Sequence, residues 1–285
     1  MDKLDPTVAG LVLLAALMHA SWNAVVKSDP DRLASFGLVM LAGCVLGAIL
    51  APFVGVPAPE SWGYLLASVL IHCVYYYFLL KAYAVGDLSH VYPIARGLGP
   101  TLVAVFSGAL IGEYLSLRET AGVVLVSLGI AGLALARGMP SADERRATAL
   151  AVMTGVTIAA YTVVDAMGAR ASGNALGYIA WLNILEGPWV FVVACLKRRG
   201  AIVPYVRRYW WRGTAGGTVA AIGYGIAIWA TSVSPVAHIS ALRETSVLFA
   251  TLMGTLLLGE SFGRKRVAAA LLMVCGLLLM NFKLG

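Results

Sequence analysis

Two arginines stand inside long apolar runs, where an ionisable side chain is costly and is therefore a candidate for function. Arg96 falls within an apolar run over 88–112, and Arg243 within another over 236–259. At membrane depth a charged side chain costs about 2.5 kcal/mol or more, so it faces protein or an aqueous cavity. Either arginine could attract a substrate carboxylate or phosphate. Alternatively, Arg96 could bond the backbone carbonyls of the glycine-proline segment that follows it, and Arg243 could pair with Glu244 or with another helix.

Polar and aromatic side chains are the second group that could do chemistry. His19, Trp22 and Asn23 are three and four residues apart and share one face of a helix, as do Tyr161 and Asp165. Well inside apolar runs they suit a cavity that binds an organic molecule, whereas aromatic residues at the ends of such runs are typical of membrane interfaces. The other predicted substrate-binding residues are Tyr76, Tyr77, Tyr83, Tyr224 and Trp229, with Arg96 and Arg243.

Two carboxyl groups within apolar runs are candidates for carrying protons. They belong to Asp165 and Glu186, and a carboxyl in a low-dielectric site can exchange protons near neutral pH. Glu186 precedes Gly187 and Pro188. A structural hydrogen bond explains Glu186 equally well, and the residues leave both interpretations open.

The segment around Arg96 combines Pro93, Gly97, Gly99 and Pro100 within eight positions. Proline removes backbone hydrogen bonds, and a loosened helix is tolerated at membrane depth where it lines a cavity. We therefore predict a hinge at these four residues. A packing kink is the alternative.

Composition indicates which elements must position these residues. Of the 285 residues, 60% are hydrophobic and 12% charged, and the mean hydropathy is +0.84. The chain is therefore predicted to be an integral membrane protein. One helix needs about 20 apolar residues to cross a bilayer, so the length accommodates about ten spans and no separate soluble domain. The predicted spans are 7–26, 34–56, 62–85, 88–112, 117–136, 147–169, 174–196, 211–233, 236–259 and 265–282.

Several classes of function are disfavoured by the motifs that the sequence lacks. It has no phosphate-binding loop, zinc-protease motif or nucleophile elbow, so we expect neither an enzyme nor a cofactor or metal. The net charge of +7 does not indicate nucleic-acid binding, because the basic residues lie in short breaks between spans. The cysteines have no metal-ligand spacing and are interpreted as buried hydrophobes: Cys44, Cys73, Cys195 and Cys275.

The distribution of lysine and arginine predicts the orientation of the chain. Fourteen of these residues fall in the breaks after the first, fifth, seventh and ninth predicted spans, against four on the other side. Because positively charged loops stay in the cytoplasm, both termini are expected outside, in a bacterial-type inner membrane. The longest basic break, 197–212, is expected to be a loop.

The sequence also repeats itself at a shift of 147 residues. The pairs that coincide are Arg96 with Arg243, Gly112-Glu113 with Gly259-Glu260, and Gly129 with Gly276. Five is an odd number of helices, so the second unit begins on the opposite side of the bilayer from the first. The two units therefore form an inverted repeat. The predicted organisation is a first repeat over 1–138, a cytoplasmic linker over 139–146 and a second, inverted repeat over 147–285.

Paired five-helix units that each close with Gly-Glu before a glycine-bearing last helix resemble the EamA branch of the drug/metabolite transporter superfamily. Ser21-Trp22-Asn23 in the first span is also similar to that family. The resemblance covers essentially the whole chain. It implies an all-α basket of ten helices, with the first, third, fourth, sixth, eighth and ninth around a central cavity. Bacterial exporters of amino acids, including aromatic ones, look nearest.

Together these features predict a secondary transporter that exports or exchanges small metabolites, amino acids above all, by alternating access. The expected partners are a small-molecule substrate and the lipid bilayer, with no nucleic acid, and the chain is expected to act as a monomer. The alternatives are a carrier of cationic drugs or phosphorylated metabolites and, in a different class, an intramembrane enzyme or a non-transporting membrane protein. Fold alone does not identify a substrate.

Overall fold

The computed structural model describes residues 4–85, 88–135, 145–258 and 264–281, and this part of the chain consists of helices and the turns between them. The predicted all-α class is confirmed there. Within these described ranges six helical stretches are long and apolar enough to cross a membrane, whereas the count of ten spans in two inverted repeats stays a prediction. The α-helices are α1 (Pro6–Lys27), α2 (Arg32–Val54), α3 (Trp62–Val85), α4 (Leu88–Ile111), α5 (Leu117–Leu135), α6 (Arg145–Ala171), α7 (Ala175–Arg198), α8 (Ile202–Val233), α9 (Val236–Arg243), α10 (Thr245–Leu258) and α11 (Arg264–Asn281), with 3₁₀ turns η1 (Pro59–Ser61) and η3 (Arg199–Ala201).

Short polar side chains mark where the first two helices begin. The Asp5 carboxylate accepts hydrogen bonds from the backbone N–H groups of Thr7 at 2.7 Å and Val8 at 3.2 Å. These hydrogen bonds lower the pKa of Asp5, and the one from Val8 has the largest effect. Asp31 caps α2 in the same way, by accepting from the N–H of Ala34. Such caps satisfy donors that the first turn of a helix leaves unpaired.

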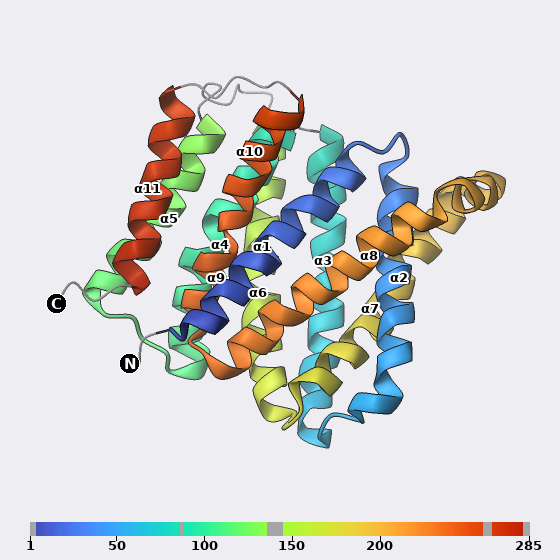
Figure 1. Cartoon of the computed structure of the whole chain (residues 1–285), viewed down its shortest axis with the longest axis horizontal. Coiled ribbons are helices and arrows are strands. Elements are labelled where there is room, and N and C mark those ends of the chain that lie inside the picture. Colours follow the sequence, from blue (N-terminus) through green and yellow to red (C-terminus); the bar gives the residue numbers. More distant parts are fainter. Residues whose placement is uncertain (1–3, 86–87, 136–144, 259–263, 282–285) are drawn as a thin grey trace.

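The long helices pack side by side around the middle of the molecule (Figure 1). Extensive contacts join α2 with α7, α5 with α11, α3 with α6, α4 with α6, and α1 with α8. In Figure 1 the beginning of α2 and the beginning of α11 both lie at the upper end of the bundle. Basic residues at these two helix starts, Arg32 and Arg264, therefore share one end of the molecule.

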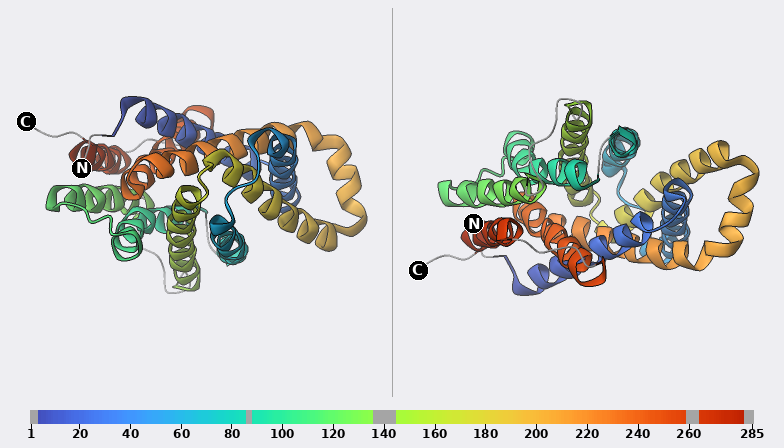
Figure 2. Two further views of the ribbon diagram at one scale, coloured as in Figure 1. Left: turned by 90° about the horizontal axis from the view of Figure 1, so that it is seen from below. Right: turned by 90° about the horizontal axis from the view of Figure 1, so that it is seen from above.

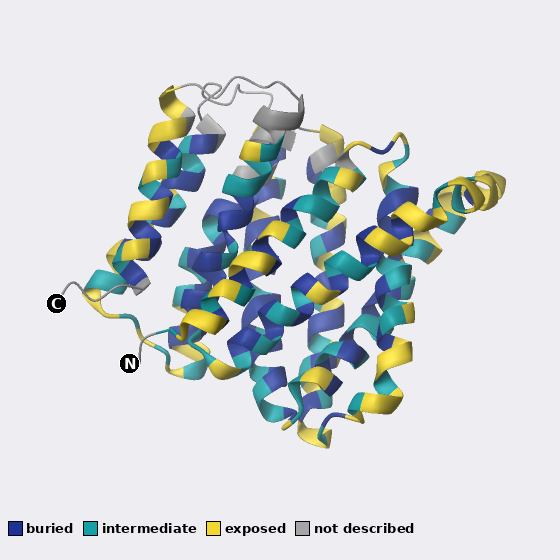
Figure 3. Cartoon of the chain, in the orientation of Figure 1, coloured by how far each residue is buried: buried dark blue, intermediate teal, exposed yellow. Residues whose placement is uncertain are grey.

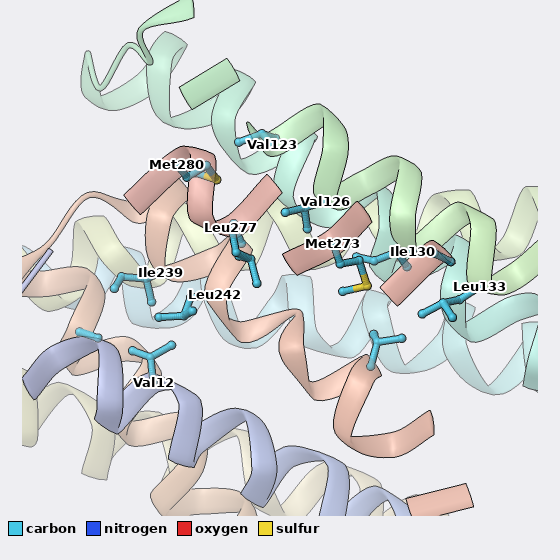
Figure 4. Close-up of a cluster of buried hydrophobic side chains, with 14 of the residues drawn as sticks. Val12, Val123, Val126, Ile130, Leu133, Ile239, Leu242, Met273, Leu277 and Met280 are labelled. Carbon is cyan, nitrogen blue, oxygen red and sulfur yellow. The ribbon is translucent and has the colours of Figure 1, made fainter. Parts of the chain in front are cut away.

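Close approach of α5 and α11 depends on glycine. A Cβ atom on Gly122 would fall 2.7 Å from the Gly276 carbonyl oxygen, so a larger residue would force the helices apart. Between membrane helices, small residues allow the close packing that the hydrophobic effect cannot drive in lipid. Val126, Ile130 and Met273 are fully buried in the apolar cluster beside this contact (Figure 4).

The outward faces of the helices carry exposed apolar side chains. Exposed residues, yellow in Figure 3, line the outside of the bundle, and buried ones concentrate between the helices. Phe53 is 83% exposed, Leu196 71% and Leu70 67%. Soluble proteins rarely leave so many large apolar groups on their surface, so this surface suits a lipid environment.

The predicted loop over 197–212 is wrong. α7 continues to Arg198, one 3₁₀ turn follows, and α8 already begins at Ile202. The apolar run of the eighth predicted span begins at 211, but arginine and aromatic residues are compatible with a helix, so the helix extends beyond the apolar run. Both views in Figure 2 show this end of α7 and α8 projecting beyond the other helices.

The predicted span 236–259 is divided at Glu244 into α9 and α10. The Glu244 N–H donates to the Ala241 carbonyl at 3.1 Å, and the Glu244 carbonyl accepts from Val247 at 2.9 Å. Bonds across three residues tighten the backbone locally, as in a 3₁₀ turn. The two short helices therefore meet at a charged residue.

α4 is one helix through the residues where the sequence predicts a hinge. It runs without interruption past Pro93, Gly97, Gly99 and Pro100. Gly97 lies against α5, where a Cβ would come within 3.3 Å of the Ile130 side chain. In this conformation the glycine serves helix packing, and the hinge stays a prediction.

Candidate functional site

A pocket opens between α1, α8 and α9. His19 and Trp22 of α1, Tyr224 of α8 and Arg243 of α9 line it together with small residues, around a partly open cavity of about 10 Å³, which holds roughly one water molecule. Pockets for small organic ligands usually measure about 300–1,000 Å³. The helices must therefore part before a metabolite fits. One cation among aromatic rings is a combination that suits an organic anion.

Arg243 supplies the positive charge of this pocket. It is the last residue of α9, where the helix breaks, and its guanidinium carbon lies 5.3 Å from the centroid of the Tyr224 ring. That distance is within the range of a cation–π interaction. No ion pair joins Arg243 to a carboxylate within the described ranges. Among the described residues Arg243 therefore faces the pocket without an ion-pair partner within 4 Å, although the Glu244 carboxyl interacts with it at longer range.

Arg96 is placed differently, in a buried ion pair. Its Nε lies 3.4 Å from Oε2 of Glu244, and its Nη2 donates to the Ser246 hydroxyl at 3.3 Å. Arg96 and Glu244 are 5% and 2% exposed. The pair joins α4 to the junction of α9 and α10. Glu244 thus has its close ion pair with Arg96, and it interacts with the neighbouring Arg243 only at longer range.

Aromatic rings continue from the pocket into the bundle. Trp22 lies edge-on to His19 at 5.3 Å between ring centroids and stacks on Phe36 of α2 at 6.1 Å. Phe36 in turn meets Tyr76 of α3 at 5.2 Å. Motion of Trp22 would therefore be felt at α2 and α3.

Deeper in the bundle, His72 and Glu186 lie beside one another. His72 Nε2 is 3.9 Å from Glu186 Oε1, and the Tyr76 hydroxyl donates a hydrogen bond to the same carboxyl group. The His72 ring stacks on Tyr161, with 4.1 Å between centroids. Both His72 and Glu186 are buried.

Asp165 of α6 holds a second buried carboxyl group. Its two oxygens accept hydrogen bonds from the hydroxyls of Tyr178 at 3.0 Å and Tyr224 at 2.5 Å. Tyr224 therefore touches both the pocket and the buried carboxyl. A cation–π contact from Arg243 to Tyr224 and the hydrogen bonds of Asp165 thus link the pocket to the middle of the bundle.

Glu113, in the turn after α4, ties one end of the bundle together. Its Oε1 pairs with Nη1 of Arg170 at 2.7 Å, and its Oε2 accepts from the N–H of Val236 at 2.8 Å. Arg170 also donates to the carbonyls of Thr231 and Ser234, each at 3.0 Å. This latch joins the ends of α4, α6 and α8 to the beginning of α9.

Comparison with protein families identifies the chain. The model of the EamA-like transporter family matches residues 7–135 and again residues 145–282. The chain belongs to the EamA-like transporter family. It is thus a multi-pass membrane protein of a transporter family within the drug/metabolite transporter superfamily, and that family is not one of enzymes.

Comparison with solved structures shows the same fold for this EamA-like transporter. A structure described only as "Crystal structure of protein" is similar, with a TM-score of 0.77 and 18% sequence identity. The match covers 96% of this chain and 94% of that one. At this identity it supports the fold alone. No curated protein matches the sequence.

In this EamA-like transporter the structure brings most of the predicted binding residues into two adjoining groups. The pocket takes His19, Trp22, Tyr224 and Arg243, and the network beside it takes Tyr76, Tyr161 and Asp165. Their role in binding stays a prediction.

Other predicted residues of the EamA-like transporter lie apart from the pocket. Tyr77 is 58% exposed, beside Phe78 on the outer face of α3. The Asn23 amide donates to the backbone carbonyl of His19 at 2.8 Å, within α1. Trp229 packs against the apolar cluster of Figure 4. The side chains of Tyr83 and Pro93 lie outside the described residues.

Sequence reasoning missed His72, Tyr178 and the pairing of Glu244 with Arg96. His72 lies four residues before Tyr76, so helical spacing already placed it on the face of a predicted site residue. Tyr178 and Glu244 come from elements whose approach only the fold reveals. Among the described residues no group of three His, Cys, Asp or Glu side chains is placed to hold a metal ion.

Proposed function

We propose that this EamA-like transporter is a secondary carrier that exports or exchanges amino acids, including aromatic ones, by alternating access. The observation that carries the proposal is the pocket in which Arg243 lies beside Trp22 and Tyr224. The guanidinium group suits the carboxylate of an amino acid, and the rings suit an apolar or aromatic side chain. The polar network behind Tyr224 provides partners for an amino group.

Alternating access is supported by the pairing of helices. In the predicted repeat, α6, α7 and α8 are the equivalents of α1, α2 and α3. The contact of α1 with α8 is therefore equivalent to that of α6 with α3, and α2 packs on its own equivalent, α7. Such exchange is expected of repeats over 1–138 and 147–285, joined by 139–146, which rock around a shared site. The Glu113–Arg170 latch then closes one end and must open during the cycle.

The same reasoning extends to the surroundings of the transporter. We place it in a bacterial-type inner membrane as a monomer, with both termini outside and the basic helix starts of α2 and α11 in the cytoplasm. The alternative cargoes are ranked by charge. A phosphorylated metabolite would also be attracted by Arg243, whereas a cationic drug would be repelled by it.

The test is counterflow in proteoliposomes with a panel of amino acids that includes phenylalanine, tyrosine and tryptophan. We expect saturable counterflow in the wild type and a loss of at least about tenfold in Arg243→Ala, because a charge-assisted bond to a carboxylate contributes about 1.5–3 kcal/mol. Trp22→Ala should reduce the counterflow of aromatic amino acids more than that of small ones.

Tyr77→Ala is the matched control, because it removes an aromatic side chain that the structure places on the outer face of α3. It should keep wild-type flux. Flux of a phosphorylated metabolite without amino-acid flux would support the pocket as the binding site but would show that the proposed substrate class is wrong. Flux that is equal in Arg243→Ala and the wild type would remove the proposed site.

A further inference from the structure

Glu186 is a buried carboxyl group without a permanent cation beside it. Among the described residues, its ion-pair partner is His72, which is charged only when protonated. The Glu186 carboxyl also accepts a hydrogen bond from the Tyr76 hydroxyl. Removing an isolated carboxylate from water costs several kcal/mol, and proteins offset this with a partner or a proton. The charge of Glu186 is therefore matched by a proton, held by the carboxyl or by the imidazole.

His72 turns its Nε2 toward Glu186, and its other ring nitrogen contacts Ser68. Its Nδ1 lies 2.9 Å from the backbone carbonyl oxygen of Ser68 and 3.2 Å from the Ser68 hydroxyl oxygen. The carbonyl, at the shorter distance, can only accept, which favours a hydrogen on Nδ1, and in that neutral tautomer Nε2 is the bare nitrogen. Nε2 and Glu186 Oε1 are 3.9 Å apart. Two acceptors face each other there unless a proton resides on one of them.

Several titratable side chains from neighbouring helices surround the His72–Glu186 pair, and among the described residues none of them is a lysine or an arginine. α3 contributes Cys73, Tyr75 and Tyr76, α6 contributes Tyr161 and Asp165, α7 contributes Tyr178, and α8 contributes Tyr224. α2 contributes the uncharged Met40 and Phe36. Asp165 differs from Glu186 because both of its oxygens already accept from phenol hydroxyls.

One layer of rings separates the His72–Glu186 pair from the pocket. The His72 ring centroid lies 4.1 Å from that of Tyr161 and 5.9 Å from that of Tyr224. Tyr224 lines the pocket beneath Arg243. A substrate that displaces Tyr224 therefore disturbs the packing that holds His72 against Glu186.

We propose that the Glu186–His72 pair is the proton-binding site through which this carrier couples substrate movement to a proton. In the loaded state the proton resides on the Glu186 carboxyl, because a neutral acid beside a neutral imidazole avoids two buried charges. The proton leaves through Nε2 of His72 to water on one side of the membrane, and one proton from the other side returns to the carboxyl, so each cycle moves one proton across. The proposal rests on the transport function proposed above.

Coupling is tested by comparing two kinds of flux in proteoliposomes. The probe is phenylalanine, or the amino acid of the panel with the highest counterflow. In the wild type an imposed pH gradient should drive accumulation, and reversing the gradient should reverse the effect. Glu186→Gln should lose this drive at least about tenfold while counterflow at equal pH stays within about twofold, because exchange needs no net proton movement.

Glu119→Gln is the matched control. Glu119 also lies beside a histidine, with 3.4 Å between its Oε1 and Nε2 of His238, but at the beginning of α5. It should keep the response to the pH gradient. A gradient response retained in Glu186→Gln would overturn the proposal. Wild-type protein that shows counterflow but no accumulation driven by the pH gradient would also overturn the proposal, while leaving the transport function in place.

An infrared titration of the detergent-solubilised protein separates the two proposals if no amino acid is transported. The wild type should show the band of a protonated carboxylic acid that is absent from Glu186→Gln and present in Glu119→Gln. Identical carboxylic-acid bands in the wild type and Glu186→Gln would overturn the proton site, whatever the substrate is.

Discussion

α4 and the α9–α10 pair are equivalent in the predicted repeat, yet they respond oppositely to their composition. α4 contains Pro93, Gly97, Gly99 and Pro100 and remains one helix, whereas the chain around Glu244 has neither proline nor glycine and breaks. The Thr245 hydroxyl accompanies the break by donating to the Leu242 carbonyl at 2.8 Å. Side-chain partners, more than intrinsic helix propensity, therefore decide where this helix is interrupted.

The same comparison explains the different roles of the two arginines. Arg96, on the intact helix, reaches across to Glu244 and is buried. Arg243, at the broken end, is left without that partner and faces the pocket. The carboxylate beside the break thus holds the first arginine in a buried ion pair, whereas the second lines the pocket, and binding of a ligand by Arg243 stays a prediction.

The largest expected effect is on stability when Arg96 is removed. Arg96→Ala leaves Glu244 buried and without its partner, which should reduce the free energy of unfolding by about 3–5 kcal/mol. Arg243→Ala leaves no buried carboxylate unpaired and should keep near wild-type stability while transport fails. Denaturant unfolding in detergent micelles, followed beside counterflow, measures both quantities.

Arg96→Met combined with Glu244→Leu is the control for this comparison. Removing both charges at once should recover most of the stability lost in Arg96→Ala, because no buried charge then lacks a partner. Equal destabilisation by Arg96→Ala and Arg243→Ala would contradict the division of roles between the two arginines.

Patterns local in the sequence predicted the helices well and the break poorly. Apolar runs placed α3 at 62–85, its observed bounds, because a membrane helix needs an unbroken apolar stretch. The break at Glu244 depends on Arg96, about 150 residues away in the sequence, so no local pattern could indicate it. The start of α8 was missed because a helix can outlast its apolar run.

The candidate site was predicted in part for the same reason. Helical spacing grouped His19 with Trp22 and Tyr161 with Asp165, and these residues do share faces toward the pocket and the network. Which helices approach one another was not available from spacing. The contact between His72 and Glu186 joins α3 to α7 and became visible only in the fold.

A smaller effect distinguishes packing from bending in α4. A Cβ on Gly99 would meet its nearest atoms at 3.9 Å, an ordinary contact, whereas one on Gly97 would meet Ile130 at 3.3 Å. Gly99→Ala should therefore raise the free energy of unfolding by about 0.5–1 kcal/mol, through better helix propensity, while Gly97→Ala gains less or nothing. Thermal unfolding in detergent compares the two variants.

Transport by Gly99→Ala then tests the hinge. If α4 must bend at its glycines, Gly99→Ala slows counterflow although the protein is more stable. If α4 moves as a rigid helix, flux stays at the wild-type rate, and the predicted hinge is wrong.

An exposed ion pair provides the contrast to Arg96–Glu244 and the smallest expected effect. Arg198 donates to Asp31 at 2.5 and 3.1 Å, joining α7 to the beginning of α2, but the two side chains are 41% and 27% exposed. Solvent screens such a pair, so Asp31→Asn should reduce the free energy of unfolding by only about 0.2–0.5 kcal/mol at pH 7.

The pH dependence of this small effect has a definite sign. The hydrogen bond from Arg198 lowers the pKa of Asp31 below its ordinary value of 3.8. A lowered pKa in the folded state contributes stability that is present above that ordinary value and is lost as pH falls through the folded pKa. The free energies of unfolding of the wild type and Asp31→Asn should therefore differ at pH 7, begin to approach each other near pH 3.8, and converge only below the lowered folded pKa of Asp31. Because Asn can still cap α2, a difference that persists in acid would mean that Asp31 stabilises the fold through something other than its charge, and this pair could then not be compared with the buried pair of Arg96 and Glu244.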